Sequence, residues 1–486
     1  MSPIVILGII VCYFAGLVAV SLFTSRGATN ESFFSANKNS KWYLVAFGMI
    51  GTSLSGVTFI SVPGQVGATQ WSYLQLVFGY LAGYLVVGGV LMPLYYRLNL
   101  ISIYAYLEQR LGVASYKTGA FFFLLSRSIG SAARFYLVIN VLQFAVFQPL
   151  GVPFTVTVIL AIALIWLYTF KGGMKTIIWT DTLQSFFMLL SVGISIFLIA
   201  DSLGQSLPNL LETVNKSSYS KIFFFDDYNS KDFFFKQFFS GMFITIVMTG
   251  LDQDLMQKNL TCKNIGEAQK NMFWFSLTLV FVNVLFMILG ASLYMYATAK
   301  GIELPAKRDD LFPLLALQYF SPFAGIVFIL GIIAATYAST DSALTALTTS
   351  FCIDFMNFSK RSDEAVKEKT RLKTHIGFSI LLLLIVLLFK AYNDDSIISA
   401  IFKIAGYTYG PLLGLYAFSL FTSRGVKDKF VPIVCVLSPL FCWQLNVNSE
   451  AWLNGYKFGF ELLIINGLIT FLGLLAISTK RALNTP

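Results

Sequence analysis

An aspartate stands in the middle of a long apolar segment. Asp341 is the only charged residue between Asp310 and Asp354, within the stretch YASTDSALTALTTS at 337–350. A charge deep in a membrane helix costs at least about 2.5–3.5 kcal/mol on insertion scales, so a carboxylate there predicts a functional role. A buried salt bridge or a neutral, hydrogen-bonded acid is the alternative.

Small and hydroxyl residues share one helix face with Asp341. At about 100° per residue, this face carries Ala335, Ala338, Asp341, Ser342, Thr345 and Thr349, with Ser339 at its margin. Oxygen ligands in such an array suit a hard monovalent cation. The pattern leaves open whether that cation is sodium or a proton carried by Asp341.

Further charged residues lie in other apolar segments. Asp181, in IIWTDTLQSFFMLL, is either an N-terminal helix cap or an ion ligand. Arg127 and Arg134 are seven residues apart and so point to one side of a helix, where they balance carboxylates or bind an anionic solute group. The run Asp252 to Asp254 ends another apolar segment, where solvated capping and gating both remain open.

The chain that holds these residues is strongly apolar. Of its 486 residues 56% are hydrophobic and 12% are charged, against about 25% charged in soluble domains. We expect an all-α integral membrane protein, because a β-barrel would show short alternating segments instead. A span needs about 20 apolar residues, and about 13 candidates occur. They lie near 3–24, 43–64, 71–96, 117–148, 152–171, 177–200, 235–252, 272–297, 318–352, 372–390, 396–421, 430–446 and 459–478.

Basic residues indicate the topology. The 34 Lys and Arg outnumber the 24 Asp and Glu, but they gather in alternate loops, Lys258 and Lys263 among them, so we expect no nucleic-acid partner. The positive-inside rule places the N-terminus outside and the C-terminus in the cytoplasm, in a cell (inner) membrane whose lipid surrounds the spans. The sequence does not indicate the oligomeric state.

The chain lacks the motifs of the hydrolases and pumps that we considered. It has one histidine, five scattered cysteines, and neither HExxH nor GxxxxGK[ST]. We therefore expect no catalytic residues and no enzyme.

One span is dense in weak helix formers. The segment FGMIGTSLSGVTFISVPG at 47–64 holds three glycines and four hydroxyl residues between Gly48 and Thr58. This composition predicts a helix that unwinds at mid-membrane and leaves carbonyls to bind an ion. Discontinuous helices around a midplane site are typical of secondary transporters.

These motifs together resemble the sodium:solute symporter family. The family signature is similar to LYTFKGGMKTIIWTDTLQ, and GTSLSGVTFISVPG, ISIYAYLEQRLG, DQDLMQKNL and IAGYTYGPLLG resemble further family segments in the same order. The resemblance implies a single transmembrane domain with a leucine-transporter-like core. Its two inverted five-helix repeats would lie near 42–200 and 236–421, with peripheral segments at 1–41 and 422–486.

The resemblance implies a secondary active symporter. Inward sodium flow would drive uptake of a small polar solute, such as a sugar or a carboxylate, by alternating access, with sodium as the transported coupling ion. Two alternatives remain. One is a proton-coupled symporter that uses Asp341, and the other is a transporter-like solute sensor.

The same resemblance implies site residues by position. The shared sodium site of the family falls on Gly51, Leu54, Ala335, Ala338 and Ser339, with Ala338 where many members have a serine hydroxyl. A second sodium site of some members falls on Asp181, Asp341 and Ser342. Solute contacts fall on Ser53, Ser55, Thr58, Tyr73, Gln75, Asp252 and Tyr407, and Arg127 and Arg134 suggest an acidic solute.

The role of Asp341 can be tested by one substitution. Asp341→Asn should lower sodium affinity or coupling far more than expression, because the amide keeps the side-chain shape but not the charge. Sodium dependence of solute uptake into proteoliposomes, at matched protein amounts, measures the effect. Unchanged sodium dependence in the Asn variant would make Asp341 a structural residue.

Overall fold

The chain is helical along nearly its whole described length. The structure is a computed structural model that describes residues 3–26, 29–169, 173–356, 358, 363–392 and 397–480. Its two named strands, β1 (Gly425–Val426) and β2 (Ser478–Thr479), form one short antiparallel pair in which Gly425 lies opposite Thr479. The membrane spans are therefore helices, as the composition predicts.

Nine helices among the described residues are long and apolar enough to cross a membrane. They are α1 (Pro3–Thr24), α3 (Trp42–Thr69), α4 (Tyr73–Val86) continued through α5 (Met92–Arg97), α7 (Val113–Leu142), α9 (Gly173–Ser202), α13 (Ile265–Ala299), α15 (Pro322–Ser350), α16 (Glu364–Tyr392) and α19 (Val431–Val447).

A tenth candidate span is bent. It joins α11 (Phe234–Thr245), through the π-helical turn Ile246–Gly250, to α12 (Gln253–Asn259) with a bend of 69°. Twelve predicted spans overlap one of these helices or one shorter apolar helix, and the thirteenth, 396–421, divides into two shorter ones. The prediction of an all-α multi-span membrane protein is confirmed. The shorter apolar helices are α8 (Phe154–Thr169), α17 (Ile397–Thr408), α18 (Gly410–Phe421) and α21 (Leu462–Ala476).

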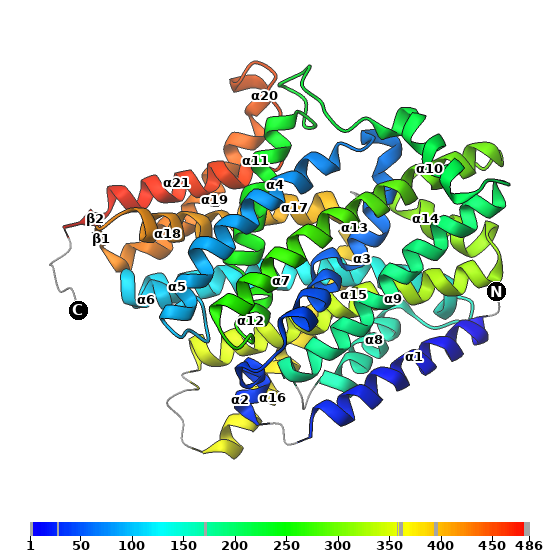
Figure 1. The fold of residues 1–486 in the computed structure, drawn as a ribbon. Helices are drawn as coiled ribbons and strands as arrows, with labels where there is room; N and C mark the ends of the chain where they lie inside the picture. The colour runs from blue at the N-terminus through cyan, green and yellow to red at the C-terminus, as the bar shows by residue number, and fades with distance from the viewer. Residues whose placement is uncertain are drawn as a thin grey trace.

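Short helices connect the spans. They are α2 (Asn30–Ser35), α6 (Ala105–Arg110), α10 (Leu207–Lys216), α14 (Leu311–Leu314) and α20 (Ser449–Trp452). The connection after α10 lies beside α20 at one end of the bundle (Figure 1), where the Lys236 ammonium donates to the Lys457 carbonyl at 3.4 Å. Gln75 holds this connection from α4: its Oε1 accepts from the Phe224 N–H at 3.0 Å and its Nε2 donates to the Asp232 carbonyl at 2.9 Å.

The helices α3 and α15 form the centre of the bundle. Within their apolar windows 89% of α3 and 83% of α15 are buried, whereas only 22% of α16 and of α19 are. α3 packs against α9, α13 and α15, while α1 lies at one edge and α18, α19 and α21 lie at the opposite edge (Figure 1). The central pair can therefore carry polar residues that lipid never contacts.

The α3 helix is interrupted at Ser55. This residue has φ 43° and ψ 172° inside an otherwise helical segment, a conformation that costs a non-glycine residue about 1–3 kcal/mol. Such a residue breaks the regular ladder of hydrogen bonds, which frees carbonyls of the preceding turn. The break lies within the segment for which the sequence predicts unwinding.

Two glycines bring α4 and α11 into backbone contact. A Cβ added to Gly79 would lie 2.0 Å from the Phe238 carbonyl oxygen, and one added to Gly241 would lie 2.0 Å from that of Leu76. Small residues permit such close approach in membrane helix pairs, where van der Waals packing drives association. The first half of the bent span is thereby fixed against α4.

This contact predicts a loss of stability on substitution. Gly79→Ala and Gly241→Ala should each destabilise the protein by about 1–3 kcal/mol, because the added methyl group forces the helices apart. Thermal unfolding of purified protein in detergent measures the change. Gly193→Ala on α9 is the matched control, since nothing lies within 4 Å of its added Cβ; equal losses in all three variants would contradict the close contact.

Candidate ion and solute sites

Asp181 of α9 lies at a junction of three further helices. The carboxylate is fully buried; its Oδ2 accepts from the Thr52 hydroxyl of α3 at 3.1 Å and from the Lys258 ammonium of α12. The Thr52 oxygen also lies 3.2 Å from the Ala338 carbonyl of α15. Asp181 Oδ1 has no hydrogen-bond partner among the described residues. The junction thus gathers hydroxyl, carbonyl and carboxylate oxygens of the kind that a hard cation needs.

Close helix approach builds this junction. The Gly51 N–H donates to the Ser185 hydroxyl of α9 at 2.9 Å, and a Cβ on Gly51 would lie 2.7 Å from that hydroxyl and 3.3 Å from the Ala338 methyl. Glycine is therefore needed at position 51 for α3 to contact α9 and α15 together. The remaining predicted ligands of the shared sodium site, Leu54, Ala335 and Ser339, are buried on α3 and α15, with the Ser339 hydroxyl donating to the Thr336 carbonyl at 2.9 Å.

Asp341 is held by α8 as well as by its own helix. Its Oδ2 accepts from the Tyr168 hydroxyl at 2.8 Å and its Oδ1 from the Ser342 N–H at 2.6 Å. The Ser342 hydroxyl instead donates to Asp254. The three residues predicted for a second sodium site are all buried, but each binds a different partner. Asp341 nevertheless lies within electrostatic range of Asp181 and Lys258.

A second ion pair lies beside this junction. Arg127 of α7 pairs with Asp254 and lies 3.9 Å from Asp252 Oδ2. The Tyr409 hydroxyl donates to Asp252, whose Oδ1 caps α12 by accepting from the Asp254 N–H at 2.8 Å. Capping by Asp252 therefore agrees with one of the two alternatives, but its solvation is wrong, because residues 252–254 are buried and Gln253 bonds the backbone of residues 101 and 103.

Sequence reasoning missed Lys258. The positive-inside rule assigns this lysine to a cytoplasmic loop, yet its side chain is about as buried as any core residue, with 1% exposed. Hydropathy does not distinguish α12 from a loop, because most of its seven residues are polar although all of them are buried. The available signal was the spacing of Lys258 four residues after Asp254, which places both on one face of a short helix.

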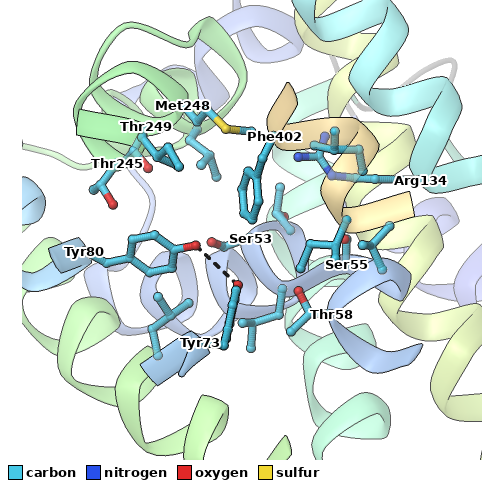
Figure 2. A pocket seen from close by; sticks show the side chains of 18 of the residues that line it. Ser53, Ser55, Thr58, Tyr73, Tyr80, Arg134, Thr245, Met248, Thr249 and Phe402 are labelled. Atoms are coloured by element: carbon cyan, nitrogen blue, oxygen red, sulfur yellow. Dashed lines mark hydrogen bonds between the residues drawn. The ribbon is translucent and has the colours of Figure 1, made fainter. Parts of the chain in front are cut away.

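A cavity lies beside the junction at Asp181 and shares Thr52 with it. Six of the predicted solute contacts line it: Ser53, Ser55, Thr58, Tyr73, Arg127 and Arg134. Figure 2 shows Tyr73 and Tyr80 on one side, joined by a hydrogen bond of 3.3 Å between their hydroxyls, and Arg134 on another. The sequence did not indicate several further lining residues: Tyr80, Tyr84, Thr245, Met248, Thr249 and Phe402.

The two arginines of α7 differ in their partners. Arg127 pairs with carboxylates of α12, whereas Arg134 makes no ion pair or hydrogen bond with any residue that the structure describes. Its side chain is 9% exposed and faces the cavity (Figure 2). A buried guanidinium without a partner is costly, and it offers a planar fork of donors to a carboxylate.

Three predicted solute contacts lie outside this cavity. Gln75 anchors the connection before α11, Asp252 belongs to the Arg127 ion pair, and the Tyr407 hydroxyl accepts from Asn446 Nδ2 at 3.0 Å. Their assignment as solute contacts stays a prediction.

The connection that Gln75 anchors contains Asp232. Burial raises the pKa of Asp232, and a hydrogen bond from Ser72 opposes that rise.

A second cavity adjoins the first. It shares Tyr73 and Phe402 with the first cavity, and it is also lined by two exposed lysines, Lys231 and Lys403, and by one acid, Asp232. Two aromatic side chains therefore separate the buried cavity from this vestibule, which is basic because two lysines outnumber one acid. The vestibule lies on the side of the connection between α10 and α11.

Sequence comparisons find one matching family and several similar proteins. A profile of the Sodium:solute symporter family matches residues 33–428. The sodium/sialic acid symporter NanT of Aliivibrio fischeri is 24% identical over 467 residues, which span 92% of this chain and 88% of that protein. SiaT of Proteus mirabilis, also a sodium/sialic acid symporter, is 24% identical over 453 residues and 89% of each chain. Human sodium-coupled monocarboxylate transporter 2 is 24% identical over 411 residues, with 81% of this chain and 64% of the human protein covered.

Structural comparisons bear on the fold. A substrate-bound, outward-open Na⁺-coupled sialic acid symporter superposes with a TM-score of 0.81 at 19% identity, over 98% of this chain and 99% of that one. Mhp1, a nucleobase-cation-symport-1 family transporter, superposes with a TM-score of 0.51 at 12% identity over 93% of each chain. These likenesses confirm the predicted leucine-transporter-like fold and at such identities show the fold alone.

The two arginines give a paired prediction of stability. Arg127→Met should destabilise the protein by about 3–5 kcal/mol, because Asp254 and Asp252 stay buried without their cation. Arg134→Met, on the same helix, removes a cation that has no carboxylate partner in the described part of the chain and should leave stability unchanged or raised. Thermal unfolding of the purified variants compares them; similar losses in both would contradict the difference in pairing.

Proposed function

This chain belongs to the sodium:solute symporter family and is a sodium-coupled solute symporter, and from that premise we propose that its solute carries a carboxylate that Arg134 binds. The observation that carries this proposal is the buried guanidinium facing the cavity with no partner among the described residues. A solute carboxylate would supply the missing negative charge through two parallel N–H···O bonds.

The rest of the cavity fits a solute with polar groups besides the carboxylate. Hydroxyls of Ser53, Thr58, Tyr80 and Thr249 line it together with the apolar side chains of Met248 and Phe402. Relatives of this chain are named for sialic acid and for monocarboxylates, two solute classes that share a carboxylate. A small carboxylate is therefore the solute class that the cavity supports best.

Sodium would bind at the junction beside this cavity. We assign one ion to the oxygens around Thr52, Asp181 and the Ala338 carbonyl, with the predicted neighbours Gly51, Leu54, Ala335 and Ser339, and we keep Asp341 and Ser342 as candidates for a second ion. Consecutive residues of α3 serve both proposed sites: Thr52 contacts Asp181 at the junction and also lines the cavity, and Ser53 lines the cavity. Such sharing would couple the two binding events, and by linkage each ligand would raise the affinity of the other.

The direction of transport follows from the proposed topology. The excess of basic residues in one set of loops puts the N-terminus outside and the C-terminus inside. On that topology the basic vestibule opens outside, where Lys231 and Lys403 would raise the local concentration of an anionic solute. Sodium moving down its gradient into the cell would then drive uptake across the cell membrane.

The assignment of Arg134 is tested by a solute screen. In proteoliposomes with an inward sodium gradient, the wild type should take up sialic acid or a small monocarboxylate, and a neutral sugar should not compete. Arg134→Gln should lower apparent solute affinity by at least about 30-fold, equivalent to about 2 kcal/mol. Arg134→Lys should recover part of that loss.

The control is Arg97→Gln, since Arg97 is an exposed arginine at the end of α5. Its uptake should equal that of the wild type. Uptake of a neutral solute that is unaffected by Arg134→Gln would overturn the carboxylate assignment while leaving sodium coupling intact. Uptake that follows the pH gradient in sodium-free buffer would instead favour a proton at Asp341.

A further inference from the structure

We propose that Lys258 is a built-in cation that competes with sodium for Asp181. Its ammonium binds Asp181 and Thr52 in the ion-free carrier, and sodium must displace it in order to bind. This inference rests on the sodium site proposed at the junction and does not depend on the identity of the solute.

The contacts of Lys258 define the competition. Its Nζ donates to Asp181 Oδ2 and to Thr52 Oγ1, the same two side chains that offer oxygens to a cation at the junction. Thr52 in turn lies against the Ala338 carbonyl. An ammonium and a sodium ion cannot both take these oxygens, because two cations so close together in a water-free site repel each other strongly.

The backbone around Lys258 is anchored, so the side chain is the part that can move. The Tyr96 hydroxyl donates to the Asn259 carbonyl at 2.8 Å, and the Asn271 amide donates to Asn259 Oδ1 at 2.6 Å. The Thr261 hydroxyl donates to the Lys258 carbonyl at 2.6 Å. A lysine stem is flexible and carries a compact charge, so the ammonium can leave Asp181 while α12 stays in place.

A displaced ammonium has a second carboxylate to approach. Asp341 lies three residues after Ala338, whose carbonyl contacts the Thr52 hydroxyl that holds the ammonium. Among the described residues, the Asp341 oxygens accept from Tyr168 and from the Ser342 N–H rather than from another cation. The neighbouring carboxylate Asp254 is already paired with Arg127. In a carrier that holds one sodium ion, at Asp181, Asp341 is therefore the acceptor that keeps Lys258 buried and neutralised.

The competition has a consequence for the transport cycle. A buried carboxylate without a countercharge is strongly unfavourable, so an ion-free carrier that lacked Lys258 would hold Asp181 uncompensated. With Lys258 in place, Asp181 is neutralised either by sodium or by the ammonium. The lysine thereby lowers sodium affinity and allows the ion-free carrier to return.

Sodium binding to the purified full-length protein tests the first consequence. Titration with sodium chloride against choline chloride, without solute, is followed by calorimetry or by intrinsic tryptophan fluorescence. Lys258→Gln should raise apparent sodium affinity by about tenfold or more relative to the wild type, because the competitor is removed. Lys258→Arg keeps a cation, so its sodium affinity should not rise.

Lys117→Gln is the matched control. Lys117 is a partly buried lysine of α7 whose ammonium donates to the Asp354 carbonyl, away from the junction, and its substitution should leave sodium affinity unchanged. Unchanged or lowered affinity in Lys258→Gln would overturn the competition, as would an equal rise in Lys258→Arg. Lys258→Met supplies the same comparison if the Gln variant does not fold.

Transport assays test the second consequence. Lys258→Gln should retain solute exchange when sodium is present on both sides, because the loaded carrier still reorients, whereas net sodium-driven uptake should fall about tenfold or more. Equal loss of exchange and net uptake would overturn the role in return of the ion-free carrier. The sodium titration needs no solute, so failure of the Arg134 assignment would leave its result unaffected.

Discussion

Lys258 and Asp254, four residues apart on α12, bind partners on four other helices, and the positions of those helices depend on these contacts. Lys258 contacts Asp181 of α9 and Thr52 of α3, while Asp254 binds Arg127 of α7 and Ser342 of α15. In an apolar body each of these charges is costly alone and stable only as a pair. The short helix α12, after the 69° bend, therefore supplies the charged groups that pair with buried polar and charged side chains of the four other helices. Any movement of α12 must replace these ion pairs and hydrogen bonds with others.

The break in α3 places the proposed ion site and the proposed solute site next to each other. Ser55, at φ 43°, interrupts the helix two residues after Ser53, and it lies within the segment that lines the cavity. Gly51 lets the same turn approach α9 and α15 so closely that an added Cβ would overlap the Ser185 hydroxyl. Because one turn of backbone would serve both proposed sites, a change at either one would reach the other without a long chain of intermediate contacts. On this proposal, coupling is a local property of α3.

Several sequence predictions agree with the structure because they rest on local physics. The apolar runs coincide with helices since a span has few other ways to satisfy its backbone in lipid, and the density of glycine and hydroxyl residues at 47–64 coincides with the break. Gln75, Asp252 and Tyr407 were grouped with the solute contacts by resemblance, yet they lie outside the cavity. The position of each residue depends on tertiary structure, namely the path of the connection before α11, the bend at α12 and the packing of α17. The order of residues along the chain does not predict these features. The inverted repeat remains a prediction.

The sequence by itself determined the class of protein, the family resemblance, and the presence of costly carboxylates at Asp181 and Asp341, because each of these depends on residue type and spacing along the chain. The tertiary structure alone decided which charges neutralise one another. Sequence context assigns Lys258 to a loop, and only the folding of α12 back into the bundle brings it beside Asp181. Arg127 and Arg134 are equivalent in the sequence, and only the structure pairs Arg127 with Asp254 while Arg134 makes no ion pair with a described residue. Pairing is a matter of a few ångströms between helices remote in sequence, so it is settled only when the bundle has packed.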